Sequence, residues 1–133
     1  MGSMPGPQNI PRILVGDDEF QICRLVRDVL RPLGYVIDTT QNGGELLEKY
    51  QAGPYSLLIL DMALLHTSGL EVVMKLRDRG DSIPIILMSG PSRDGDRAEP
   101  FAFTYRVHLL RKPFGVGELR GAVERALGTS PLD

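Results

Sequence analysis

The fold is organised around the stretch Ser56-Leu57-Leu58-Ile59-Leu60-Asp61, in which a small-to-apolar run ends in a carboxylate. An unbroken apolar run of this length is typical of a strand that is covered on both faces of a parallel sheet. A carboxylate at the end of such a strand costs several kcal/mol unless a cation or a metal ion meets it. Asp61 therefore marks a candidate site that needs partners from elsewhere in the chain.

Candidate partners follow three of the other apolar runs. They are an acidic pair after the first run, a hydroxyl after the fourth and a lysine after the fifth, namely Asp17, Asp18, Ser89 and Lys112. In open α/β sheets the ligand crevice lies outside the carboxyl ends of the strands. We therefore expect these side chains to meet Asp61 at one edge of a sheet.

Five apolar stretches alternate with amphipathic helical patterns between Arg12 and Leu127. The predicted strands cover residues 12–15, 35–39, 57–60, 83–88 and 107–110. Alternation of this kind with short links indicates βαβ units and hence a parallel sheet with helices on both faces. The sequence predicts a single α/β domain, a doubly wound sheet of five parallel strands with about five flanking helices.

The pattern is weakest between Pro91 and Arg106. A proline disfavours the helical conformation of the residue before it, so Pro100 predicts that the fourth helix is short or irregular, covering residues 93–99. The alternating aromatic residues after it are expected to enter the next strand and fold onto the core. They are Phe101, Phe103 and Tyr105.

Composition excludes several classes of protein. The 133 residues suffice for one domain with a core, and a formal net charge of -2 gives no attraction to nucleic acid or anionic lipid. No apolar run approaches the length of a membrane span, no signal pattern opens the chain, and the single cysteine, Cys23, excludes an internal disulfide. We expect a cytoplasmic protein whose domain covers residues 12–127. Residues 1–11 are expected to be a tag remnant or flexible N-terminus, and residues 128–133 a flexible C-terminus or the start of a linker.

Clustered carboxylates repel one another and favour a hard divalent cation such as Mg2+. With a metal ion drawing charge away, one carboxylate can attack a phosphoryl group and become an acyl phosphate. The strand that ends at Asp61 should be central, so Asp61 is the predicted nucleophile, with Asp17 and Asp18 as metal ligands. The Lys112 ammonium and the Ser89 hydroxyl would then stabilise the added negative charge.

Four motifs together resemble the receiver domain of two-component response regulators, and the resemblance covers the chain from Arg12 to Leu127. They are Val15-Gly16-Asp17-Asp18-Glu19, Leu58-Ile59-Leu60-Asp61, Met88-Ser89 and Lys112-Pro113-Phe114. The resemblance implies a flavodoxin-like fold with the strand order 2-1-3-4-5. It also implies a cis peptide bond between Lys112 and Pro113.

The resemblance further implies a function. A sensor histidine kinase or phosphotransfer protein would phosphorylate Asp61, and Lys112 and Ser89 would sense the phosphoryl group. The cation would be Mg2+, with Mn2+ as a substitute, held by Asp17, Asp18, Asp61 and the backbone carbonyl of Ala63. Turnover would not exceed slow self-phosphorylation from small phosphodonors and self-dephosphorylation. Homodimerisation stays open, whereas direct binding of nucleic acid or membrane is not expected.

Departures from the family pattern motivate an alternative function. Leu109 stands where the family has Tyr or Phe, and Leu64 and Leu65 stand where it has a Met-Pro pair. A degenerate receiver that binds a partner independently of phosphorylation is therefore the competing hypothesis. An aspartyl-phosphate phosphatase is disfavoured, because such enzymes carry a second acid two residues after the nucleophile, where this chain has Ala63.

Simpler interpretations apply to single residues. Asp18 could cap a helix without binding a metal. His66 and His108 have no matched partner at metal-ligand spacing, so they are expected in solvated and strand-edge positions. Cys23 falls within an amphipathic helical pattern and is expected to be a small buried residue.

Overall fold

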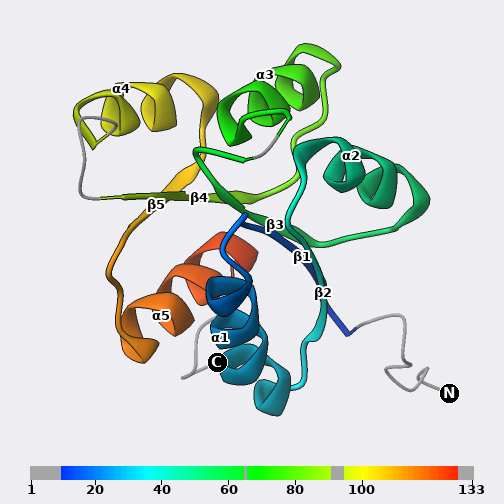
Figure 1. Ribbon diagram of the computed structural model, residues 1–133, viewed down its shortest axis with the longest axis vertical. Coiled ribbons are helices and arrows are strands. Elements are labelled where there is room, and N and C mark those ends of the chain that lie inside the picture. Colours follow the sequence, from blue (N-terminus) through cyan, green and yellow to red (C-terminus); the bar gives the residue numbers. More distant parts are fainter. Residues whose placement is uncertain (1–9, 65, 91–94, 129–133) are drawn as a thin grey trace, which may run out of the picture.

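A computed structural model describes residues 10–64, 66–90 and 95–128. Its centre is one sheet of five parallel strands in the order β2-β1-β3-β4-β5 (Figure 1). The strands are β1 Arg12–Gly16, β2 Val36–Thr40, β3 Leu57–Asp61, β4 Ile85–Ser89 and β5 His108–Arg111. The predicted parallel sheet and its order are confirmed.

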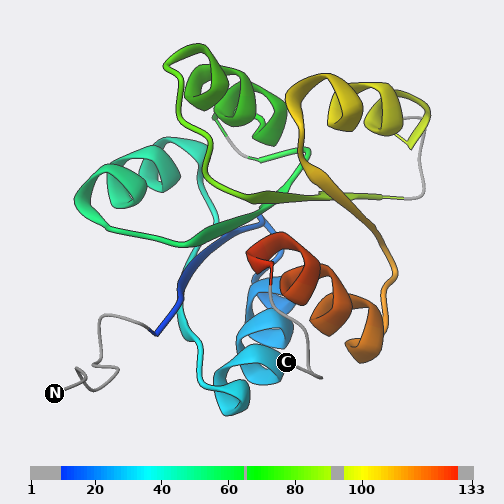
Figure 2. The same cartoon turned by 180° about the vertical axis from the view of Figure 1, so that it is seen from behind.

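Helices cover both faces of the sheet. Helices α2 (Gly43–Ala52), α3 (Gly69–Asp78) and α4 (Gly95–Tyr105) lie on one face, and α1 (Phe20–Leu30) and α5 (Val116–Leu127) lie on the other (Figures 1 and 2). Each face has its own apolar cluster, and every residue of β3 is buried. The apolar run before Asp61 is therefore central, as its sequence predicts. None of the helices in the described residues has the length and apolar character that crossing a membrane requires.

Helix α2 begins at a well-defined cap. The Asn42 side chain accepts hydrogen bonds from the Gly44 and Glu45 amides at 2.7 and 3.2 Å. Asn42 is therefore the N-cap of α2, a position that favours asparagine because its side-chain oxygen accepts from the free amides of the first turn. The Glu45 carboxylate, however, accepts a hydrogen bond from the Thr40 hydroxyl at 3.2 Å, whereas the Asn42 amide donates to the same hydroxyl. The start of α2 is thus tied to the end of β2.

Helix α4 corrects the expectation of a short fourth helix. It extends over 11 residues and continues through Pro100. Proline removes one helical hydrogen bond, but burial of Ala98 and Ala102 against the sheet favours the helix more strongly than this local loss disfavours it. Phe101 and Tyr105 therefore lie one turn apart, with ring centroids at 4.5 Å, instead of entering a strand. Residues 91–94, with the predicted start of the helix, lie outside the described residues.

Arg77 joins three chain segments at the edge of the sheet opposite the strand carboxyl ends. Its guanidinium lies near the end of α3 and donates four hydrogen bonds to backbone carbonyls, two in the α3–β4 connection and two at the end of α4 and the residue after it. The acceptors are Tyr105 at 2.8 Å, Asp81 and Ile83 at 2.9 Å, and Arg106 at 3.2 Å. One side chain therefore fixes the end of α4 to α3.

Replacing Arg77 with Met is expected to lower the free energy of unfolding by about 2–3 kcal/mol, because three partly buried carbonyls lose their donor while the apolar stem is kept. Urea unfolding at neutral pH measures the change. Arg79→Met removes an exposed arginine two residues away and should change stability by less than about 0.5 kcal/mol. Equal stability of the two variants would show that water satisfies these carbonyls equally well.

Candidate functional site

The residues predicted to form a site meet at the carboxyl edge of the sheet. Asp61 is the last residue of β3, and Asp17 directly follows β1. Ser89 ends β4, and Lys112 directly follows β5. Because all five strands are parallel, these positions share one edge. The structure therefore confirms that these four residues lie at the same edge of the sheet, as expected from the sequence.

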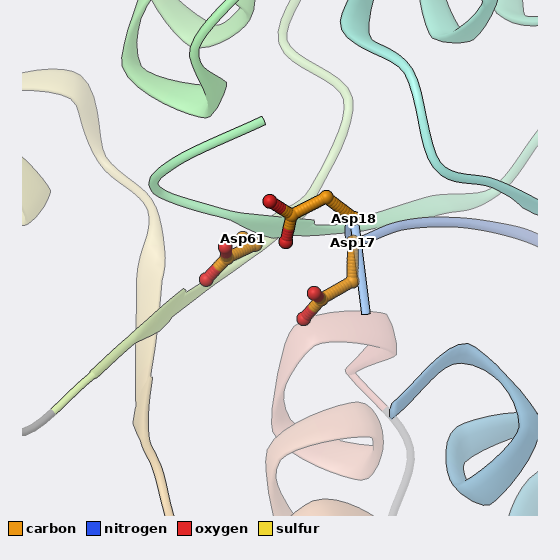
Figure 3. A group of neighbouring side chains, drawn as sticks. All are labelled: Asp17, Asp18 and Asp61. Carbon is orange, nitrogen blue, oxygen red and sulfur yellow. The ribbon is translucent and has the colours of Figure 1, made fainter. Parts of the chain in front are cut away.

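Three carboxylates form a compact cluster at this edge. Asp17, Asp18 and Asp61 each offer one oxygen, and these oxygens lie within 4.8 Å of one another (Figure 3). Asp17 is fully buried and Asp61 is buried, whereas Asp18 is exposed. The cluster therefore has one side open to solvent, through which a ligand can reach it.

Lys112 places a single ammonium among the carboxylates. Its Nζ lies 2.7 Å from Asp17 Oδ2, 3.3 Å from Asp61 Oδ1 and 3.7 Å from Glu19 Oε1. Burial alone would lower the pKa of Lys112, but the hydrogen bond and charge of Asp17 and the charge of Asp61 together raise it. Lys112 therefore stays protonated at neutral pH.

One ammonium does not neutralise this cluster. Burial, and after it the charge of Asp17, raises the pKa of Asp61 from 3.8 to about 6, even though Lys112 opposes the shift. Burial also raises the pKa of Asp17, despite its hydrogen bonds with Lys112 and the Glu19 amide. The remaining negative charge and the oxygen donors fit a hard divalent cation such as Mg2+.

Ser89 supplies an unused polar group. Its side chain is fully buried, and its Oγ has no hydrogen-bond partner among the described residues. The Lys112 amide donates to the Ser89 carbonyl at 2.7 Å, so the two residues are adjacent. A buried hydroxyl without a partner is uncommon and needs an explanation. Here it is a donor available to a ligand bound at the carboxyl edge.

The other predicted positions are less directly informative. Ala63 is exposed in the connection between β3 and α3, two residues after Asp61, and Leu65 lies outside the described residues. Leu109 is partly buried against the apolar cluster beneath α2, α3 and α4. The peptide bond between Lys112 and Pro113 is cis, as the family resemblance implies.

The simpler interpretations can also be compared with the structure. The N-cap of α1 is Glu19, with no side-chain cap, so Asp18 does not cap this helix. His66 is exposed, and His108 is half-buried in the edge strand β5. Cys23 is buried, as predicted.

Sequence reasoning did not assign roles to two residues near the site. Glu19 faces Lys112, and its signal was the uninterrupted acidic run of residues 17–19. Thr40 accepts a hydrogen bond from the Asp17 amide at 3.1 Å through its carbonyl. That contact pairs segments 23 residues apart and has no local sequence signal.

Residues 13–124 match the family model of the response regulator receiver domain. The chain belongs to this family. It is 32% identical over 126 residues to the transcriptional regulatory protein ResD of Bacillus subtilis, covering 92% of this chain and 52% of ResD. It is also 32% identical over 121 residues to DltR of Streptococcus agalactiae serotype III, covering 91% of this chain and 54% of DltR. The receiver domain thus spans about half the length of these curated relatives.

Solved receiver domains share the fold. The response regulator receiver domain protein of Clostridium thermocellum aligns with a TM-score of 0.81 at 24% identity, over 90% of this chain and 95% of its own. The chemotaxis protein CheY4 of Vibrio cholerae aligns with a TM-score of 0.78, also at 24% identity, over 89% of this chain and 99% of its own. The flavodoxin-like receiver fold implied by the motifs is confirmed, and the chain is homologous to response regulators of two-component systems.

Proposed function

We propose that this receiver domain accepts a phosphoryl group on Asp61 and thereby switches partner or output interactions in a two-component or phosphorelay pathway. One observation carries the proposal most strongly. Lys112 contacts Asp17 and Asp61 at the carboxyl edge of the sheet, within a cluster whose charge it does not neutralise. A structural ion pair needs one carboxylate, whereas a phosphoryl site needs metal ligands, a nucleophile and a cation together.

The acidic cluster is the proposed metal site. Asp17, Asp18 and Asp61, with the backbone carbonyl of Ala63, would hold Mg2+, and Mn2+ would substitute for it. Oxygen-only ligands and residual negative charge support this assignment. When bound, the ion would supply positive charge for the oxygens of an incoming phosphoryl group.

The remaining residues have separate roles in the proposed transfer. A carboxylate oxygen of Asp61 attacks the phosphorus, a new O–P bond forms, and the bond from phosphorus to the donor breaks. With a phosphohistidine donor, the broken bond is P–N, and the imidazole keeps the electron pair and takes up a proton. Lys112 neutralises the phosphoryl oxygens, and the Ser89 hydroxyl, which has no hydrogen-bond partner within the described part of the chain, donates a hydrogen bond to one of them.

The proposed partners follow from this chemistry. A sensor histidine kinase or phosphotransfer protein donates the phosphoryl group to the domain, proposed as residues 12–127. We propose that this occurs in the cytoplasm and without direct binding of nucleic acid or membrane by this segment, whose formal net charge is -2. Ala63 carries no acid for hydrolysis, so turnover is limited to slow self-phosphorylation and self-dephosphorylation.

Acetyl phosphate with Mg2+ is expected to add one phosphoryl group, detected by intact-protein mass spectrometry, and EDTA should prevent the addition. Asp78→Asn, which changes an exposed carboxylate at the end of α3, is the matched control and should be labelled like the unchanged protein. Absence of labelling under conditions that label another receiver domain would instead favour the degenerate receiver that binds partners independently of phosphorylation.

A further inference from the structure

We infer that the junction of β2 and α2, from the last strand residue Thr40 to the first helix residue Gly43, is a positioning element that holds both halves of the proposed metal site. On one side, this β2–α2 junction contacts the backbone of Asp17. On the other side it contacts Thr67, which lies two residues before a glycine packed on the backbone of Asp61. The inference rests on the proposed function, because the positioned groups are the proposed Mg2+ ligands.

The first contact fixes Asp17. The Asp17 amide donates to the Thr40 carbonyl at 3.1 Å. Thr40 is itself held, since its hydroxyl accepts from the Asn42 amide at 3.3 Å and donates to Glu45 Oε1 at 3.2 Å. It is also buried, with 2% of its surface exposed. The backbone of Asp17 therefore takes its position from the capped start of α2.

The second contact is a close approach at Gly43, the first residue of α2. A methyl group added there would overlap the carbonyl oxygen of Thr67 and would lie 2.8 Å from the Thr67 Cβ. Gly43 is buried, and Asn42 fixes the turn that contains it by capping the helix. Only glycine lets the junction and Thr67 come this close.

Thr67 is in turn coupled to the backbone of the nucleophile. Two residues later, the Gly69 amide donates to the Met62 carbonyl at 2.9 Å. A methyl group at Gly69 would overlap the Asp61 carbonyl oxygen. The start of α3 therefore packs directly against the peptide that links Asp61 to Met62. The next residue is Ala63, whose carbonyl is a proposed metal ligand.

Through these contacts the β2–α2 junction supports proposed Mg2+ ligands at the ends of two strands: Asp17 after β1, and Asp61 at the end of β3 with Ala63 two residues later. Mg2+ demands near-ideal octahedral geometry, and a site loosened by about half an ångström to an ångström loses function. An added methyl group at position 43 must displace either Thr67 or the start of α2. The first movement disturbs the backbone of Asp61 and Ala63, and the second disturbs the Thr40 carbonyl that holds Asp17.

The test is the Mg2+ affinity of Gly43→Ala, measured by isothermal titration calorimetry on folded protein. Supporting groups around a metal typically change its affinity about 10–100-fold when altered, so the dissociation constant is expected to rise at least about tenfold. Gly117→Ala is the matched control, because it places the same methyl group in the first turn of α5, where nothing lies within 4 Å. Its dissociation constant should stay within about twofold of the unchanged protein.

Urea unfolding in EDTA separates positioning from stability. A purely structural role of Gly43 would lower the unfolding midpoint but leave the Mg2+ dissociation constant of the folded protein unchanged, and that result would overturn the inference. If the protein without any substitution binds no Mg2+, both the proposed function and the inference that rests on it are contradicted. If the protein without any substitution binds Mg2+, but with the same dissociation constant as Gly43→Ala, only the positioning role is contradicted.

A second variant covers the case in which Gly43→Ala does not fold. Asn42→Ala adds no atoms and removes the two hydrogen bonds that fix the start of α2. It is expected to raise the Mg2+ dissociation constant by about two- to fivefold, because loss of a cap loosens the turn without a clash. An unchanged dissociation constant in this variant would also overturn the inference.

Discussion

Replacing Lys112 with Met is expected to lower the free energy of unfolding by about 2–4 kcal/mol at neutral pH without Mg2+. Methionine keeps most of the apolar stem but removes the ammonium that lies 2.7 Å from Asp17 and 3.3 Å from Asp61. Both carboxylates are buried and have raised pKa values even with Lys112 present. Without it they must either stay charged in a poorly solvated site or take up protons.

The pH dependence identifies the cause of this loss. Protonation of the carboxylates removes their repulsion, so the difference between Lys112→Met and the unchanged protein should shrink toward about pH 4. Urea unfolding across this pH range measures it. Lys75→Met, which removes an exposed lysine on α3, should stay within about 0.5 kcal/mol at every pH. A loss that is independent of pH would indicate altered packing rather than unbalanced charge.

Mg2+ should restore part of the stability that Lys112→Met loses. A cation that binds only the folded state stabilises it by RT ln(1 + [L]/Kd), which is about 2.7 kcal/mol at a hundredfold excess over Kd. The missing ammonium leaves more negative charge for the metal, so the stabilisation by Mg2+ should be larger in the variant than in the unchanged protein. Equal stabilisation would show that the metal lies too far away to sense Lys112.

Asp61→Asn is expected to act in the opposite direction, raising stability in EDTA by roughly 1–3 kcal/mol at neutral pH while abolishing phosphoryl uptake. The pKa of Asp61 is raised from 3.8 to about 6, so ionisation of this group opposes folding. Asparagine has nearly the same shape and removes the charge. Loss of the contact with Lys112 offsets part of the gain, because the ammonium then has fewer carboxylates to balance it.

The sign of this effect is testable by titration. A carboxyl whose pKa is raised on folding binds more protons in the folded state, so its contribution to stability is lost as pH rises through about 6. The advantage of Asp61→Asn should therefore be largest above about pH 6 and fade toward about pH 4. Asp78→Asn provides the exposed control. A lower free energy of unfolding for Asp61→Asn in EDTA would mean that the charge of Asp61 stabilises the folded protein instead of destabilising it.

Local sequence patterns predicted the sheet and much of the site. The apolar run before Asp61 identified a strand covered on both faces, and the alternation of strands with helices identified a parallel sheet. Because all carboxyl ends of such a sheet share one edge, the meeting of Asp17, Asp61, Ser89 and Lys112 followed from topology before any distance was known. The proposed chemistry depends on these four side chains.

Features that depend on tertiary contacts were not predictable in this way. Pro100 lies inside α4 because packing of the helix against the sheet outweighs one lost hydrogen bond. Arg77 bonds to carbonyls up to 29 residues away, which no periodicity reveals. The close approach of Gly43 to Thr67 likewise joins two connections that are separate in sequence. The need for glycine at position 43 becomes evident only when the position of the Thr67 backbone is known.

The most direct test of the central claim is the location of the phosphoryl group. After reaction with acetyl phosphate and Mg2+, borohydride reduces an aspartyl phosphate to homoserine and releases phosphate, and peptide mass spectrometry locates the reduced residue. Reduction at residue 61 alone, absent from Asp61→Asn and from samples with EDTA, is the expected result. Reduction at Asp17 or Asp18, or labelling that persists in Asp61→Asn, would contradict the assignment of Asp61 as the phosphoacceptor.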